Sequence, residues 1–75
     1  MEKLTESVEE YLEAIFKLSR EETPVTVGIV ADALGVSSPS VSEMVRRLRA
    51  AGLVEKDRSR GIRLSRAGRG QGARL

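Results

Sequence analysis

Residues 34–52 read LGVSSPSVSEMVRRLRAAG and contain the clearest structural pattern in the chain. Gly35 stands where a residue with a left-handed backbone commonly closes a helix. Pro39 suits the first turn of a new helix, because an N–H at that position has no partner within the helix. We therefore expect one helix to end at Leu34 and another to cover 39–51. The candidates for capping the start of this second helix are Ser38 and the capping-box pair of Ser40 and Glu43.

The helix expected over 39–51 has two unlike sides. At about 100° per residue, its apolar side chains fall together, and they are Val41, Met44, Val45, Leu48 and Ala51. The opposite side is basic, small and polar, and carries Pro39, Glu43, Arg46, Arg47 and Ala50, with Ser42 and Arg49 on one flank. One side is thus suited to a core and the other to a polar partner.

One more helix is expected near the start of the chain, over 6–20. Its apolar residues recur every three or four positions, and they are Val8, Tyr11, Leu12, Ile15 and Leu18. Thr5 is the expected N-cap. Pro24 ends this helix, because proline disfavours helical geometry in the residue before it. A very short strand is expected at 24–25.

A short helix and a hairpin complete the pattern. The helix is predicted over 27–34, with Thr26 as its cap. Strands are predicted over 53–56 and 62–64, on either side of a polar turn at 57–61 that contains a glycine. Three arginines lie at or beside the tip of this hairpin, namely Arg58, Arg60 and Arg63. The predicted fold is mainly α with a small β-hairpin, which is a winged helix-turn-helix of three helices plus a wing.

The fold is expected to occupy residues 1–64, leaving 65–75 as the start of a linker helix or a disordered tail. Ser65 can cap a helix. Glycine in a helix costs about 1 kcal/mol relative to alanine, and this segment contains Gly68, Gly70 and Gly72. We expect a turn of helix over 65–68 and disorder over 71–75.

Composition argues against most kinds of enzyme. The 75 residues include no Cys and no His, which removes thiolate nucleophiles, the commonest metal ligand and the usual general base at neutral pH. An enzyme is therefore the least favoured class. The sequence shows neither an apolar run of about 18 residues nor a signal peptide. We expect a cytoplasmic protein with no membrane partner.

The net charge of +2 conceals a strong asymmetry along the chain. Residues 1–45 carry three basic and nine acidic side chains, a balance of −6. Residues 46–75 carry ten basic and two acidic side chains, a balance of +8. A basic half of a small domain favours a polyanion partner, most often nucleic acid, although a solvated charged surface would show the same count.

Together, the order of elements and the charge predict a protein that binds duplex DNA. The helix over 39–51 would enter the major groove, with Arg46 and Arg47 on its outer side. The wing over 57–61 would lie along the phosphates through Arg58 and Arg60, which makes binding salt-dependent. The alternative is a protein-interaction module, because winged helices also serve as docking surfaces.

Four segments resemble the diphtheria toxin repressor family of metal-dependent transcriptional repressors for iron and manganese uptake. They are LTESVEEYLEAI at 4–15, LGVSSPSVSEM at 34–44, GLVE at 52–55 and RGIRLS at 60–65. The resemblance covers about residues 4–69. It implies a repressor that binds duplex DNA as a homodimer.

The resemblance also implies roles for individual residues. Those opening the recognition helix are Ser37, Pro39 and Ser40, the one facing bases is Glu43, and those approaching phosphates are Ser42, Arg47 and Arg60. This sequence departs from the family at two positions before and within the short helix. Thr26 stands where a basic residue is usual, and Ile29 stands where an acid is usual.

The resemblance further implies a metal site that involves Glu10 and Glu13. Acidic residues at these positions are metal ligands in the manganese-responsive branch of the family, whereas the iron-responsive branch has Met at the first. The two carboxylates lie three residues apart on one side of a helix and are hard ligands suited to Mn²⁺. We expect Mn²⁺ or Fe²⁺ at an incomplete site, because the family takes its other ligands from a following dimerisation domain. The alternative is a solvated acidic face, with no metal bound by this chain.

Overall fold

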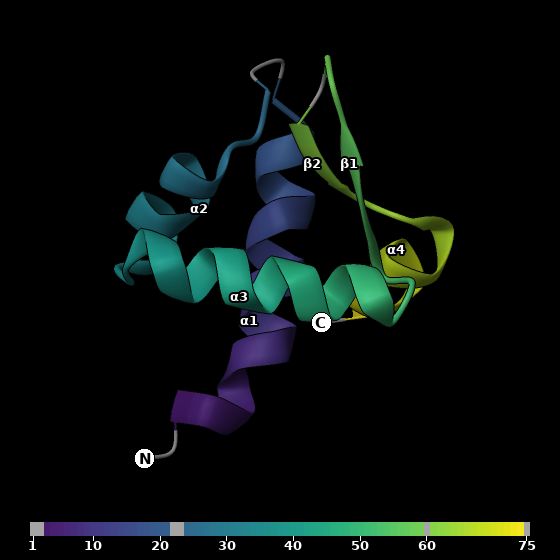
Figure 1. The fold of residues 1–75 in the computed structure, drawn as a ribbon. Helices are drawn as coiled ribbons and strands as arrows, with labels where there is room; N and C mark the ends of the chain where they lie inside the picture. The colour runs from purple at the N-terminus through teal and green to yellow at the C-terminus, as the bar shows by residue number, and fades with distance from the viewer. Residues whose placement is uncertain (1–2, 22–23, 60, 75) are drawn as a thin grey trace.

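A first helix, a helix-turn-helix, an antiparallel hairpin and a final helix follow one another along the chain (Figure 1). The computed structural model describes residues 3–21, 24–59 and 61–74. Its elements are α1 (Lys3–Ser19), α2 (Val27–Leu34), α3 (Ser38–Ala50), β1 (Val54–Asp57), β2 (Gly61–Leu64) and α4 (Arg66–Arg74). No helix in the described part of the chain is long and apolar enough to cross a membrane. The predicted winged helix-turn-helix is confirmed.

The core lies where the apolar faces of α1, α2, α3 and the hairpin meet. Its fully buried side chains are Leu12, Ile15, Val30, Val41 and Ile62. Two predicted core residues lie outside it. Val8 is 39% exposed because the first turns of α1 extend beyond the body of the molecule (Figure 1). Ala51 is exposed because it follows the last residue of α3.

The first helix begins earlier than predicted. It starts at Lys3, so Thr5 lies within the first turn and is not its N-cap. An i,i+4 ion pair lies on this helix, with 3.4 Å between Lys17 Nζ and Glu13 Oε2.

The turn between α2 and α3 follows the predicted chemistry, with one correction. Gly35 has a φ of 70°, and its N–H donates to the carbonyl oxygen of Ala31 at 2.8 Å. The cap of α3 is Ser37, not Ser38, and the predicted capping box of Ser40 with Glu43 does not form. Ser37 Oγ accepts from the Ser40 N–H at 3.3 Å and donates to Ser40 Oγ at 2.9 Å. The serine pair thus satisfies an amide that the helix cannot satisfy itself.

The first strand of the hairpin lies one residue later than predicted, the second begins one residue earlier and ends as predicted, and the hairpin is held to the segment before α2. Lys56 lies opposite Ile62, and Asp57 lies opposite Gly61. The Ile62 N–H donates to the carbonyl oxygen of Val25 at 2.8 Å, and Val25 forms an isolated parallel bridge with Gly61. The short strand expected at 24–25 is therefore a single bridge. Gly61 has a φ of 78°, and a Cβ there would collide with the Val25 carbonyl.

The segment after the hairpin forms α4, so the disorder predicted over 71–75 is wrong for 71–74. Residue 75 lies outside the described residues. Ser65 Oγ caps the helix by accepting from the Gly68 N–H at 3.1 Å, and it donates to the carbonyl oxygen of Gly52 at 2.6 Å. A Cβ on Gly68 would collide with the Leu53 carbonyl. The glycine that weakens the helix locally thus permits its close packing against the chain before β1.

Candidate nucleic-acid interface

The outer face of α3 is uncovered. Its sequence alternates between three buried apolar residues and exposed polar ones, and Figure 1 shows α3 lying across the front of the molecule. Every predicted interface residue at this helix is exposed, namely Ser37, Pro39, Ser40, Ser42, Glu43, Arg46 and Arg47. The structure therefore leaves each of these predicted residues accessible to solvent. A rigid helix held by its opposite face is a suitable element to insert into the major groove.

An ion pair runs along this exposed face. The distance from Arg46 Nη2 to Glu43 Oε1 is 3.3 Å, and the two side chains are 76% and 63% exposed. Such exposed pairs contribute little to stability, about 0–1 kcal/mol. Because the pair is so weakly held, both groups are available to a partner. Arg47 makes no ion pair with any described residue.

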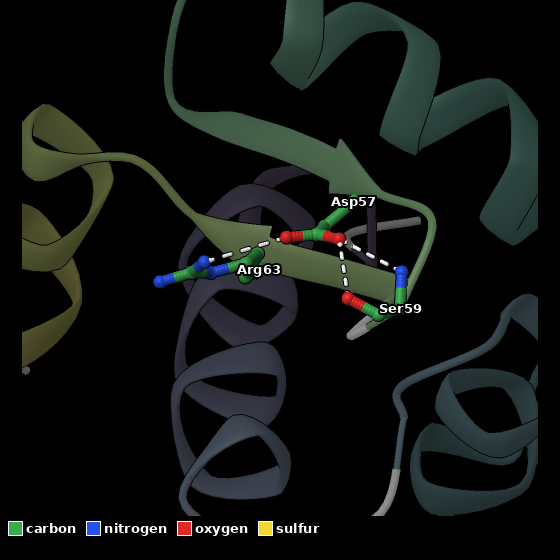
Figure 2. Close-up of polar contacts among 3 residues, drawn as sticks. All are labelled: Asp57, Ser59 and Arg63. Carbon is green, nitrogen blue, oxygen red and sulfur yellow. Dashed lines mark hydrogen bonds and ion pairs between the residues drawn. The ribbon is translucent and has the colours of Figure 1, made fainter.

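The turn of the wing is organised by Asp57, as Figure 2 shows. One carboxylate oxygen, Oδ1, accepts from the Ser59 N–H at 2.8 Å and from Ser59 Oγ at 3.1 Å. The other, Oδ2, lies 3.7 Å from Arg63 Nη1. This local bonding is typical of an Asx turn. It leaves Arg58 exposed between two anchored neighbours.

The three arginines predicted around the wing tip have different environments. Arg58 is exposed in the turn, as a phosphate contact requires. Arg63 is only 25% exposed at its side chain and is paired with Asp57, so it supports the hairpin. Arg60 lies outside the described residues.

Sequence reasoning missed Lys56 as a surface charge near this interface. Alternate residues of a strand point to opposite faces, so Lys56 shares a face with Val54 and lies opposite the fully buried Ile62. Lys56 is nevertheless exposed. The alternation of residues along each strand indicates which side chains share a face, but placing Lys56 opposite Ile62 also requires the register of the two strands.

The two candidate metal ligands line one shallow pocket between α1 and α2. The pocket has a volume of about 480 Å³ and includes Glu10, Glu13 and Lys17 in its lining. Glu10 is exposed, and Glu13 is paired with Lys17. The described residues contain no group of three or more His, Cys, Asp or Glu side chains that could hold a metal ion. Two carboxylates alone do not fit a transition-metal site with a full ligand set.

Comparison with known sequences finds a matching protein family and a similar transcriptional regulator. Residues 3–62 match the family described as iron dependent repressor, N-terminal DNA binding domain. The chain is 38% identical over 71 residues to the HTH-type transcriptional regulator MntR of Shouchella clausii (strain KSM-K16). That match covers 95% of this chain and 50% of the relative, so the chain spans about half the length of that protein.

Solved structures share the fold. The metal-dependent transcriptional regulator MtsR superimposes with a TM-score of 0.85 at 33% identity, covering 92% of this chain and 32% of that one. ScaR with bound Zn²⁺ gives a TM-score of 0.80 at 31% identity, covering 89% of this chain and 31% of that one.

Proposed function

Because this chain belongs to the iron-dependent repressor family and carries its N-terminal DNA-binding domain, we propose that it binds duplex DNA with α3 in the major groove and the wing on the phosphates. The observation that carries this proposal is the uncovered polar face of α3, which adjoins a wing whose turn presents Arg58. The basic balance of residues 46–75 supplies the attraction for a polyanion.

We assign three kinds of contact to the exposed residues. Ser37, Pro39 and Ser40 open the recognition helix at the edge of the groove. Glu43 faces the bases, where a carboxylate accepts from the N4 amino group of cytosine. The proposed phosphate contacts are Ser42, Arg46, Arg47, Arg58 and Arg60. These contacts fix the position of the helix, whereas the base contact sets the preferred sequence.

The proposed regulation is repression in response to Mn²⁺ or Fe²⁺. Glu10 and Glu13 would contribute two hard oxygen ligands, which favour Mn²⁺. The remaining ligands would come from outside the described residues, as would a homodimer interface. We therefore propose that DNA binding by the 75-residue chain is weak and nearly independent of metal.

A gel-shift titration with duplex DNA at rising salt concentration tests the proposal. Affinity should fall steeply with salt, because each neutralised phosphate releases condensed counterions. Failure to bind duplex DNA, or binding that does not change with salt, would contradict it. Circular dichroism of the same sample establishes that the chain is folded.

The structure does not favour the alternative of a protein-interaction module. An exposed apolar strip on α1 would support that alternative, but Tyr11, Leu12 and Ile15 are buried. Charge reversal at Arg46 and Arg47 still separates the two functions, because it should abolish DNA binding and leave a protein contact through α1 intact.

A further inference from the structure

The wing and the start of α2 enclose a groove beside the recognition helix. In Figure 1 the segment that leads into α2 passes beside the start of β2, above α3, and the bridge between Val25 and Gly61 joins the two. The groove has a volume of about 530 Å³. Its lining includes Val25, Thr26, Arg49, Lys56, Arg58 and Ile62. The segment leading into α2, the end of α3 and the hairpin thus form one concave surface.

The charged lining of this groove is basic and has few internal partners. Arg49, Lys56 and Arg58 are all exposed, and none forms an ion pair with a described residue. Asp57 also lines the groove, but its carboxylate is bonded to Ser59 and close to Arg63. Clustered like charges repel one another in the free protein. A bound polyanion relieves that repulsion.

The register of the hairpin explains why Asp57 does not neutralise Lys56. Neighbouring residues on a strand point to opposite faces. Lys56 shares a strand face with Val54 and lies across from Ile62. The Asp57 carboxylate is instead bonded to Ser59 and lies 3.7 Å from Arg63. Lys56 therefore has no ion-pair partner among the described residues.

The groove is continuous with the outer face of α3. At about 100° per residue, Arg49 lies on the same flank of α3 as Ser42 and next to Arg46. We propose that this groove of the protein is a second phosphate-binding surface, an inference that rests on the proposed function. Arg49 and Lys56 would hold the DNA backbone that borders the major groove occupied by α3. In the segment before α2, Thr26 is uncharged and its side chain caps the helix. The two cations proposed to bind phosphate therefore come from α3 (Arg49) and β1 (Lys56).

The test compares Arg49→Gln and Lys56→Gln with Arg69→Gln, which removes an exposed charge on α4 outside the groove. Each protein is titrated against a random-sequence duplex at several salt concentrations. Each groove variant should lower the slope of log affinity against log salt by about 0.9 and weaken binding about eightfold at about 0.1 M salt. Arg69→Gln should change neither quantity. Matching thermal unfolding curves would show that the variants fold normally.

The outcomes separate this proposal from the proposed function. If the unmodified chain binds DNA and Arg47→Ala weakens it, but both groove variants keep the original slope, the groove proposal is wrong and the proposed function stands. If the unmodified chain does not bind duplex DNA, both are wrong.

Inorganic phosphate alone distinguishes a backbone site from a site for a free anion. It is titrated into isotope-labelled protein while the amide signals of Val27 and Gly28 are followed by NMR. If the groove binds the DNA backbone, inorganic phosphate should cause only small changes in these chemical shifts, and the changes should not saturate as its concentration rises. Saturation at low phosphate concentration, with DNA binding unaffected by the groove variants, would overturn the proposal.

Discussion

The wing and the carboxylate pocket between α1 and α2 differ in how much of each site the chain supplies. In the wing, Asp57 bonds to Ser59 and pairs with Arg63, so residues within one hairpin fix the turn. In the pocket, Glu10 and Glu13 are brought together without a third acidic, His or Cys side chain among the described residues. A DNA-binding surface can therefore be assembled from this chain, whereas a complete metal site requires other ligands.

The largest effect is expected from Gly61→Ala, which should destabilise the wing. Gly61 has a φ of 78°, and a Cβ there would collide with the Val25 carbonyl. We expect a loss of about 2–4 kcal/mol in the free energy of unfolding, measured by chemical denaturation. The matched control is Gly70→Ala, where nothing lies within 4 Å of the added Cβ. It should leave stability unchanged or raise it slightly, and an equal loss in both variants would refute the argument.

A smaller effect on DNA binding is expected from Arg47→Ala. Removing one phosphate contact should weaken binding to all duplexes by about eightfold at about 0.1 M salt. Glu43→Gln provides the contrast, because it should change which bases are preferred in a selection from randomised duplexes. A change of sequence preference in Arg47→Ala, with none in Glu43→Gln, would reverse the assigned roles.

Asp57→Ala is expected to have a moderate effect, since it removes both the acceptor for Ser59 and the partner of Arg63. We expect a loss of about 1 kcal/mol in stability and a decrease of a few-fold in DNA affinity as Arg58 loses its anchored setting. Asp57→Asn keeps an acceptor for Ser59 and should retain most of the affinity. Equal losses in the two variants would show that the charge, and not the turn, is what matters.

The smallest effect is expected from metal. Adding Mn²⁺ or Fe²⁺ to the 75-residue chain should change its DNA affinity by less than about twofold, because two carboxylates make a weak site. Glu10→Gln and Glu13→Gln should behave like the unmodified chain in the same gel shift. A large response to metal that these variants abolish would show that the two carboxylates act without further ligands.

Most elements of the fold follow from local signals in the sequence. Gly35, Pro39 and Thr26 mark helix ends because of backbone geometry and hydrogen bonding that each residue brings wherever it stands. The predicted N-cap of α3 was wrong because several neighbouring serines can take the same role. Ser37, Ser38 and Ser40 can all cap, and the structure has Ser37 in this role, with Val41 buried in the core four residues later.

The predicted interface on α3 also followed from local periodicity, since a helix with three buried apolar residues must expose its other side. The groove beside it could not be predicted in this way. Arg49 and Lys56 belong to different elements, and their approach depends on the hairpin register and on the bridge from Val25 to Gly61.

The 34–52 segment and the charge asymmetry specified a helix-turn-helix with a polar, basic outer face, because caps, turns and helical periodicity are properties of neighbouring residues. Long-range packing specified what neighbouring residues cannot. It packed α4 closely against the chain before β1, where Gly68 meets Leu53, left Val8 exposed, and brought Lys56 beside Arg49 and Arg58. These outcomes depend on which surfaces meet, and contacts between distant segments exist only once the chain has folded.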